Sequence, residues 1–524
     1  MKKIKILEVN NIDLAGNRFN GYDMIEEISD NQFEIKQAVI TKLSDNKNVV
    51  TIINTNSKNE CLNKLDSYEE NNSLKNVFSI TTPSLMKLKE YQEADIIHFH
   101  MFHNTKLSLY SIRKIACEKK VVLSLHDPWF ITGRCVHFYD CEKWKTGCKK
   151  CPNLNNLFPF KEDNCNSMWN LKKQVLNNVD IDLVVATEWM ENLAKTSPIT
   201  KNQKYIHKIP FGIDHKKFRS ITNEEARKYY KIPKDHVVLF LRAQNEFKGT
   251  PYVVEALKEL KTTEKITILT CDTKNLLDEI KDKYNVIDLG NIKDKEMIKA
   301  MNACDIFLMP SIGESFGLMA IEAMACSKPV IVFNNSALPS VTHAPKCGYL
   351  VKNRDSHDLM KSIKKLVESK EERKKRGDLG YQYILKEYTN DEYNKKIKEM
   401  YLKIYNRNQV QPKLKITGDK YNLEQLKYIL NSFTVMLFGI SSKYAKSLLF
   451  KKISTKKDNN YKVKYDDILV QELIYEYCQK LDDALTEQKI LYNGKRLKIE
   501  KAIFLLRNNP KDFLKRVIKR VKRR

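Results

Sequence analysis

The stretch Glu314-Ser-Phe-Gly-Leu-Met-Ala-Ile-Glu322 separates two carboxylates by seven residues and lies between two apolar runs. This order predicts a strand, a tight loop, a helix and a second strand. Gly313 and Gly317 are expected where the backbone turns sharply and approaches a ligand closely. The helix N-terminus would offer N–H groups to a phosphate, and Glu322 could accept hydrogen bonds from ribose hydroxyls. The alternative is an ordinary strand–loop–helix unit with two surface acids.

The same stretch resembles the Glu-x7-Glu motif of the retaining glycosyltransferases of family 4, which have the GT-B fold. The order Pro-Ser-x-x-Glu-Ser-Phe-Gly-Leu, followed by Glu-Ala-Met-Ala-x-x-x-Pro-Val, carries the resemblance. The resemblance implies that Glu322 holds the ribose of a nucleotide donor. It also implies that Glu314, with the backbone at Phe316, Gly317 and Leu318, holds the sugar hydroxyls and the phosphate.

A basic pair, Arg242 and Lys248, follows the short apolar run 237–241. Negative charge grows on a diphosphate leaving group as the glycosidic bond breaks, and fixed cations stabilise that charge. Arg can bind two phosphate oxygens at once, whereas Lys acts as a compact point charge. The pair matches the family's Arg-x5-Lys motif, which ends in Lys-Gly, so both residues are expected at the diphosphate. Taken alone, two cations among 92 would be solvated surface residues.

A third match is Ile209-Pro-Phe-Gly-Ile-Asp-His-Lys-Lys-Phe218, which resembles the family's Pro-x-Gly-Ile-Asp-x-x-x-Phe segment between the two domains. Gly212 is expected to supply a backbone conformation closed to other residues. Asp214 is expected to be a turn or cap residue rather than a catalyst. The resemblance extends from about residue 1 to about residue 405, and we recognise no match beyond it.

The length and composition of the chain agree with a large cytoplasmic protein. Its 524 residues predict two or three domains, and 42% of them are hydrophobic. No apolar run approaches the ~18 residues that a membrane span requires. The chain has twelve cysteines and no recognisable export signal, which favours free thiols in a reducing compartment over a disulfide framework.

Apolar runs alternate with helical patterns in both halves of the chain, which predicts the α/β class with two doubly wound, Rossmann-like domains facing a cleft. The expected domains are an acceptor-side domain over 1–208 and a nucleotide-sugar-binding domain over 209–390. A return helix over 391–410 and a basic, mainly helical extension over 411–524 would follow. The runs expected as strands are residues 4–9, 34–40, 49–53, 96–100, 121–126, 183–186, 237–241, 265–270, 286–289, 306–310 and 330–333.

Two positions in the first half are candidate site residues. His126 ends an expected strand, and the resemblance implies that it contacts the donor sugar. The alternative is a histidine that caps the strand or is satisfied by local hydrogen bonds. Gly16 lies in the loop after the first strand, which is expected near the phosphates and the acceptor. This loop departs from the family, which commonly has adjacent glycines there, so its phosphate contacts stay open.

A cysteine-rich loop over 133–152 contains Cys135, Cys141, Cys148 and Cys151. The final Cys-x2-Cys pair has good metal-ligand spacing, whereas the first gap is wider than in a regular zinc ribbon. Similar insertions occur in a subset of family 4 polysaccharide glycosyltransferases. Three readings stay open, namely a structural zinc site, a redox pair, and thiols that pack without a ligand. A catalytic metal is not expected, because the basic pair fills the role that a metal would have at the diphosphate.

The last part of the chain is strongly basic. Residues 411–524 hold 27 Lys and Arg against 12 Asp and Glu, a net charge of +15. Residues 510–524 predict an amphipathic helix with basic flanks, which typically lies on an anionic membrane surface. The alternatives are a solvated basic tail and a nucleic-acid-binding segment. No nucleic-acid recognition motif is present, so we expect no nucleic-acid partner.

Together these features predict a retaining glycosyltransferase at the inner face of the plasma membrane. It would transfer a sugar from a UDP- or GDP-sugar to a glycan or lipid-linked acceptor of a capsule, lipopolysaccharide or exopolysaccharide. The expected catalytic residues are Arg242, Lys248, Glu314 and His126, with no catalytic cofactor and no assigned protein nucleophile. Two alternatives belong to other classes, a nucleotide-sugar epimerase with the GT-B fold and a non-catalytic GT-B subunit that binds glycan or a partner.

Overall fold

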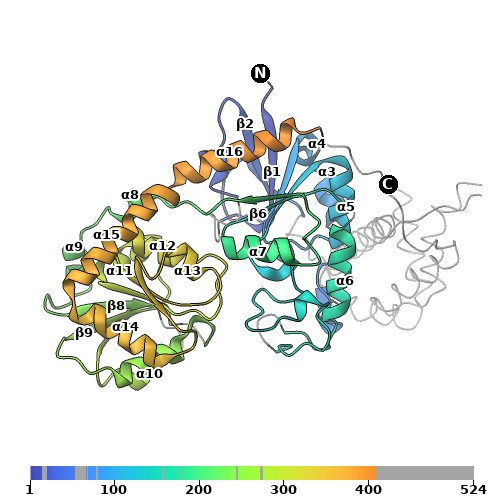
Figure 1. Cartoon of the computed structure of the whole chain (residues 1–524). Helices are drawn as coiled ribbons and strands as arrows, with labels where there is room; N and C mark the ends of the chain where they lie inside the picture. Colours follow the sequence, from blue (N-terminus) through green and yellow to red (C-terminus); the bar gives the residue numbers. More distant parts are fainter. Residues whose placement is uncertain are drawn as a thin grey trace, which may run out of the picture.

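The computed structural model describes residues 2–14, 21–53, 66–67, 69–77, 81–155, 159–177, 179–243, 246–271 and 275–408. These residues form two α/β domains that lie side by side (Figure 1). Within these ranges, no helix combines the length and the apolar character needed to cross a membrane. Three predictions lie outside the described residues: the role of Gly16, the extension over 411–524 and the amphipathic helix over 510–524.

The first domain is built on a seven-stranded parallel sheet with the strand order β3-β2-β1-β4-β5-β6-β7. The order reverses between β1 and β4, so ligands are expected beyond the carboxyl ends of these two strands. The strands are β1 Ile4–Ile12, β2 Phe33–Thr41, β3 Val49–Thr51, β4 Ile96–Phe99, β5 Lys120–Ser124, β6 Asp182–Val185 and β7 Tyr205–Lys208.

The second domain has a six-stranded parallel sheet with the order β10-β9-β8-β11-β12-β13, which reverses between β8 and β11. The predicted α/β class with two Rossmann-like sheets is therefore confirmed. All eleven predicted strands are present, with ends shifted by at most a few residues, and β7 and β13 were missed. The strands are β8 Val237–Leu241, β9 Ile266–Thr270, β10 Asn285–Asp288, β11 Ile306–Met309, β12 Val330–Phe333 and β13 Gly348–Val351.

Helices cover both faces of each sheet (Figure 1), and the central strands β8, β9 and β11 are accordingly buried along their whole length. In the second domain, α10 and α14 pack on one face, and α11, α12 and α15 pack on the other. The helices are α1 Met24–Glu27, α3 Thr82–Lys87, α4 Lys89–Glu93, α5 Leu109–Glu118, α6 Cys165–Leu176, α7 Glu188–Thr196, α8 His215–Phe218, α9 Asn223–Tyr229, α10 Thr250–Glu259, α11 Asp294–Ala303, α12 Leu318–Ala325, α13 Leu338–Val341, α14 Ser356–Glu368, α15 Lys370–Glu387 and α16 Asn390–Asn406.

The chain connects the two domains twice. Helix α16 passes back from the second domain and packs on the first sheet, where Ile397, Met400 and Tyr401 are buried (Figure 1). The outgoing segment meets the returning one at Gly212, where a Cβ atom would lie 2.8 Å from the carbonyl oxygen of Thr389. The expectation that Gly212 adopts a special conformation was wrong, because its φ lies outside the left-handed region. Glycine is needed there because the two backbones approach each other closely.

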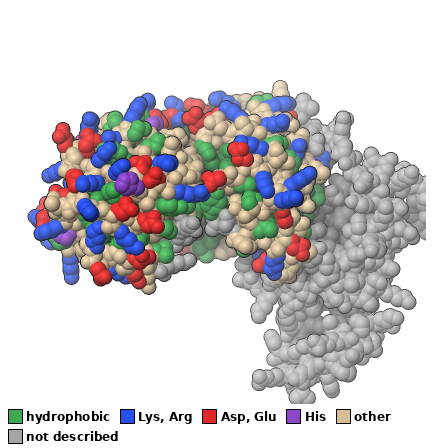
Figure 2. All heavy atoms as spheres, turned by 60° about the horizontal axis from the view of Figure 1, so that its bottom comes forward, with side chains coloured by type: hydrophobic (Ala, Val, Ile, Leu, Met, Phe, Trp, Pro, Cys, Tyr) green, Lys and Arg blue, Asp and Glu red, His purple; other side chains and the backbone are tan. Residues whose placement is uncertain are grey.

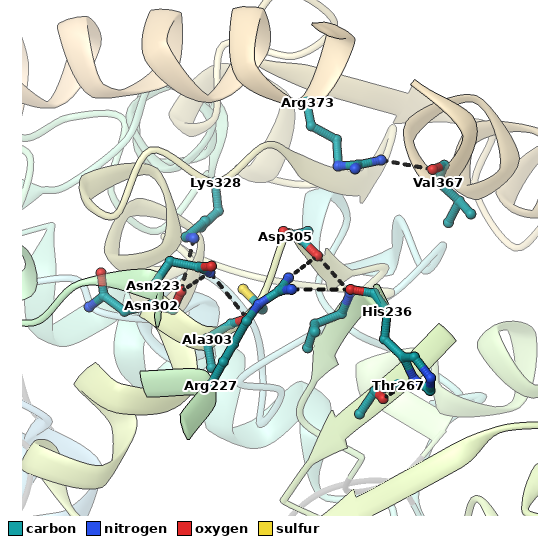
Figure 3. A network of polar contacts seen from close by, with 12 residues as sticks. Asn223, Arg227, His236, Thr267, Asn302, Ala303, Asp305, Lys328, Val367 and Arg373 are labelled. Atoms are coloured by element: carbon teal, nitrogen blue, oxygen red, sulfur yellow. Dashed lines mark hydrogen bonds and ion pairs between the residues drawn. The ribbon is translucent and has the colours of Figure 1, made fainter. Parts of the chain in front are cut away.

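A polar cluster fixes the amino ends of β8 and β11, opposite the expected ligand site (Figure 3). Arg227 on α9 forms an ion pair with Asp305 and donates to the carbonyl oxygen of His236 at 3.2 Å. Asp305 also accepts from the backbone N–H of Val238 at 2.7 Å. At the start of α8, the side chain of Asp214 accepts from the backbone N–H of Lys217 at 3.1 Å, so its predicted role as a cap is confirmed. These contacts are structural, and they leave the carboxyl ends of the strands for ligand binding.

Candidate active site in the cleft between the domains

A cavity of about 540 Å³ opens between the carboxyl ends of the two sheets. Both domains contribute to its wall, as the reversal of strand order in each sheet predicts. The lining residues are Asn10, Asn11, Ile12, Met101, His103, Asn104, Leu125, His126, Asp127, Val136, His137, Ala186, Phe211, Phe247, Glu314, Ser315, Phe316, Gly317 and Leu318.

The loop before α12 forms the wall on the second domain. Gly317 caps the helix with φ +97°, a left-handed conformation that favours glycine, and a Cβ there would lie 2.7 Å from Leu338. The backbone N–H of Glu314 donates to the hydroxyl of Ser336 at 2.9 Å, which fixes the loop. Because α12 begins at the cavity wall, the positive end of its dipole favours an anionic group there.

Lys248 and Glu314 form an ion pair beside this wall, with side chains only 24% and 13% exposed. The lysine ends a short 3-10 helix, and Gly249 follows it with φ +76°. A Cβ on Gly249 would lie 1.9 Å from the carbonyl oxygen of Pro310, so the turn can approach β11 only with glycine. The structure thus brings together two predicted site residues that are 66 positions apart.

The predicted residues fall into three groups. His126, Glu314, Phe316, Gly317 and Leu318 line the cavity, and Lys248 is joined to it through its ion pair. Arg242 is exposed immediately after β8, and Glu322 is half-buried one turn into α12. Neither of these two is among the lining residues, so their roles at the diphosphate and the ribose stay predictions.

His126 is placed by a ring stack and a hydrogen bond. Its ring stacks on Phe211 with centroids 5.7 Å apart, and its Nε2 lies 3.0 Å from Nδ1 of His100. Burial lowers the pKa of His126 well below its usual value, and the charges of His100, His98 and His103 lower it further. His126 is therefore a neutral imidazole at physiological pH.

Two aromatic side chains of the cavity wall were not predicted. Phe211 lies between the domains, with its ring 5.1 Å from that of Phe316 and nearly perpendicular to it. His137 reaches the cavity from the cysteine-rich loop, and its ring lies 4.6 Å from that of Phe247. Burial lowers the pKa of His137, although the carboxylate of Glu314 opposes the shift. Phe211 was within a recognised motif, whereas no pattern in the sequence identified His137.

The cysteine-rich loop also bridges the two domains. Asp140 at its tip forms an ion pair with Arg354 of the second domain at 2.6 Å. Elsewhere along the cleft, the hydroxyl of Thr187 donates to the carbonyl oxygen of Ser315 at 3.1 Å. These contacts hold the first domain against the loop that carries Glu314.

The four predicted cysteines converge with a fifth. Cys135, Cys141, Cys148, Cys151 and Cys165 all line one small cavity of about 10 Å³, roughly the space of one water molecule. Burial raises the pKa of the Cys135 thiol to about 12 and that of the Cys148 thiol to about 11. A bound cation would reverse these shifts, because it stabilises thiolates.

The spacing of these sulfur atoms is wider than in a formed metal site. Within the described residues, only Glu8, His98 and His100 place three ligand atoms of His, Cys, Asp or Glu within 4.8 Å of one another. Binding one zinc ion would therefore require the sulfur atoms of the loop to move closer. A structural zinc bound by Cys135, Cys141, Cys148 and Cys151 stays a prediction. Cys165, which lines the same cavity, was not among the predicted ligands.

A second cavity of about 510 Å³ lies on the first domain and shares part of its wall with the cleft. Asn11, His103, Asn104 and Val136 line both cavities. The ring of Trp129 and charged side chains such as Lys106 complete the second one. The two cavities are therefore neighbours that share part of one wall.

Comparison with known proteins agrees with this geometry. Residues 222–383 match the family model described as glycosyl transferases group 1. WcaC of Escherichia coli K12, named as a colanic acid biosynthesis glycosyl transferase, is 25% identical over 269 residues, which cover 47% of this chain and 61% of WcaC. CapM of Staphylococcus aureus, a capsular polysaccharide biosynthesis glycosyltransferase, is 24% identical over 235 residues, which cover 42% of this chain and 61% of CapM.

The alignment thus spans about three fifths of each of these relatives. Among solved structures, HepE of Anabaena in complex with UDP and glucose superposes with a TM-score of 0.53 at 14% identity, covering 76% of this chain and 99% of HepE. At this identity the likeness concerns the fold alone. The described chain therefore has the GT-B fold, and its residues 222–383 match the model of the group 1 glycosyl transferases.

Proposed function

We propose that the chain is a retaining glycosyltransferase that moves a sugar from a nucleoside-diphosphate sugar to a glycan or lipid-linked acceptor. The observation that carries this proposal is the Lys248–Glu314 pair, which lies beside the start of α12 and faces His126 across the cleft. A cation, a helix N-terminus and a carboxylate are the groups that a sugar diphosphate requires from its binding site.

Different residues of the site bind different parts of the donor. Lys248 and Arg242 neutralise the departing diphosphate, and the backbone at Phe316–Leu318 binds its oxygens. Glu314 holds the sugar hydroxyls, and Glu322 holds the ribose. The leaving group shields one face of the sugar while its oxygen accepts the proton of the incoming hydroxyl, which retains the configuration. The acceptor enters through the second cavity, whose wall continues into the cleft.

The relatives support the wider setting. WcaC is named for colanic acid biosynthesis and CapM for capsular polysaccharide biosynthesis, and HepE was solved with UDP and glucose. We therefore propose a UDP- or GDP-sugar as donor and a capsule, lipopolysaccharide or exopolysaccharide as product. A cytoplasmic location at the inner membrane face, a structural zinc and the absence of a catalytic cofactor belong to the same proposal.

The experiment is a donor screen followed by a transfer assay. A nucleotide sugar that binds only the folded protein raises its melting temperature, which identifies the donor. Transfer is then measured with that donor and a lipid-linked acceptor, using Glu314→Gln as the matched inactive variant. Epimerised donor without acceptor would favour the epimerase alternative. Donor binding without any turnover would favour a non-catalytic subunit.

A further inference from the structure

A buried polar network lies directly behind His126, and it converges on one carboxylate. Glu8 on β1 is fully buried, as are His98 and His100 at the end of β4. Nε2 of His100 lies 2.7 Å from Oε2 of Glu8, and the hydroxyl of Tyr401 on α16 donates to Oε1 at 2.6 Å. The network therefore joins both strands at the switch point of the first sheet to the returning helix.

Glu8 is a carboxylate at neutral pH. Burial raises its pKa, but the charges and hydrogen bonds of His98 and His100 outweigh burial and bring the pKa to about 2. Burial and the charge of Glu8 raise the pKa of Tyr401 well above its usual value, so its hydroxyl keeps its proton. The hydroxyl of Tyr401 donates its single proton to Glu8. Nδ1 of His98 lies 2.7 Å from the same hydroxyl oxygen, so this nitrogen must donate and the oxygen must accept.

The carboxylate dictates which ring nitrogen of each histidine carries a proton. An ionised carboxylate only accepts, so Nε2 of His100 must donate to Glu8. At a pH at which the ring of His100 is neutral, its other nitrogen, Nδ1, is then an acceptor. The hydrogen bond at 3.0 Å between His100 and His126 must therefore take its proton from Nε2 of His126. The neutral ring of His126 consequently has its lone pair on Nδ1.

We propose that Glu8 and His100 are positioning residues that hold His126 in one tautomer and orientation, so that Nδ1 accepts a hydrogen bond from a hydroxyl of the donor sugar. The inference rests on the proposed function for the presence of that sugar in the cleft. An imidazole with the opposite tautomer would present a donor at the same place, and the hydroxyl would then have to accept there and direct its own proton elsewhere. The sequence separates Glu8 from His100 by 92 positions, so no local pattern reveals the pair.

The test reverses the tautomer without removing the network. In Glu8→Gln, the amide oxygen can still accept from Tyr401, which turns the amide NH₂ toward His100. His100 must then accept through Nε2 and donate through Nδ1, and the proton of His126 moves to its own Nδ1. Nitrogen-15 spectra of the histidine side chains report this change directly. The His126 signals are assigned by their loss in His126→Gln.

Tyr401→Phe is the matched control, because it removes a hydrogen bond from the same carboxylate but leaves the branch to His100 intact. We expect the tautomer of His126 to reverse in Glu8→Gln and to stay unchanged in Tyr401→Phe. We expect turnover to fall at least tenfold more in Glu8→Gln than in Tyr401→Phe, with equal affinity of both for the free nucleoside diphosphate.

A second pair of variants covers the case in which Glu8→Gln fails to fold. His100→Gln can donate to Glu8 and accept from His126, and we expect it to keep the tautomer and most of the turnover, whereas His100→Leu should lose both. A proton on Nδ1 of His126 in the unaltered protein would overturn the proposal, and so would unchanged turnover in a variant with the reversed tautomer. If no donor is transferred at all, the proposed function fails, while the spectra still decide whether Glu8 sets the tautomer.

Discussion

The ion pair between Lys248 and Glu314 places opposite charges beside the site where a donor would bring two more negative charges. A bound diphosphate would compete with Glu314 for the lysine, and the carboxylate would then turn to the sugar hydroxyls. Both side chains are mostly shielded from water, so the exchange would occur where charge interactions are strong. The pair would therefore couple the binding of the phosphate to the binding of the sugar.

Lys248→Ala and Arg242→Ala should each lower turnover by about 10² or more, the scale of losing one group that stabilises transition-state charge. The matched control is Lys265→Ala, which removes an exposed ion pair with Asp235 at the amino end of β9. Steady-state transfer assays with the identified donor measure the effect, and melting temperatures verify the fold. Near-normal turnover in both site variants would show that Arg242 and Lys248 do not stabilise the leaving diphosphate.

Glu8 should make the stability of the first domain depend on acid. Its folded pKa of about 2 lies below the unfolded value of 4.5, so its contribution is complete above pH 4.5 and is lost as the pH falls toward 2. The full contribution would be about 3 kcal/mol. Urea unfolding of the unaltered protein and Glu8→Gln should therefore show a stability difference that shrinks between pH 5 and pH 3. A difference that stays constant over this range would contradict the depressed pKa.

At the scale of elements, the turns rather than the strands determine where the site residues lie. Gly249 both adopts a left-handed conformation and lets the turn contact the end of β11. Gly317 does the same at the start of α12, against Leu338. These two turns fix Lys248 and Glu314 relative to each other. The addition of one Cβ atom at Gly249 or Gly317 can therefore separate the two side chains.

Gly249→Ala should lower both stability and turnover, because its Cβ would meet the backbone of Pro310 and the φ angle is unfavourable for alanine. Gly290→Ala is the matched control, since it has a φ of +61° and nothing within 4 Å of the added Cβ. The control should lose only about 1 kcal/mol, the cost of the left-handed conformation. Thermal unfolding that shows equal losses for both variants would exclude the close contact as the cause.

The cysteine-rich loop makes a separate prediction at this scale. If Cys135, Cys141, Cys148 and Cys151 bind an ion, purified protein should contain about one zinc per chain, and Cys148→Ser with Cys151→Ser should lose it. Cys165→Ser is the informative control, because this thiol lines the same cavity but lies outside the predicted set. Elemental analysis decides the matter. Loss of zinc in Cys165→Ser as well would show that Cys165 is also a ligand. A metal-free but active protein would exclude the zinc site and favour packed thiols or a redox pair.

The elements also show what the sequence could and could not predict. The strands β8, β9 and β11 at the centre of the second sheet are short, mainly apolar runs, so they were found, whereas β7 is an edge strand with exposed residues and β13 begins with a glycine. Glycine is required at the start of β13 because a Cβ on Gly348 would lie 1.9 Å from the carbonyl oxygen of Val330. The motifs located Lys248 and Glu314 separately. Their pairing and the position of His137 depend on tertiary contacts, which local patterns do not encode.

At the scale of the whole molecule, the two domains are held by two chain crossings and by side-chain contacts across the cleft. Ile213 pairs with Thr389 where the crossings meet, and Thr187 and Asp140 contact the second domain farther along. On the face seen in Figure 2, basic and acidic side chains are interspersed over both domains. Residues 411–524 carry +15 of the total net charge of +27, so we expect attraction to an anionic membrane to come largely from this segment.

The terminal segment 511–524 carries eight Lys or Arg against one acid, with Phe513, Leu514 and Val517 among its apolar residues. Each cation adds roughly 1 kcal/mol near an anionic surface, an attraction that salt screens. Truncation after Asn509 should therefore release the protein from anionic vesicles while transfer to a soluble acceptor analogue continues. Binding of the full chain should fall as salt rises and should be weak on neutral vesicles. Vesicle sedimentation measures both, and equal sedimentation of the two forms with anionic vesicles would place the membrane contact elsewhere in the molecule.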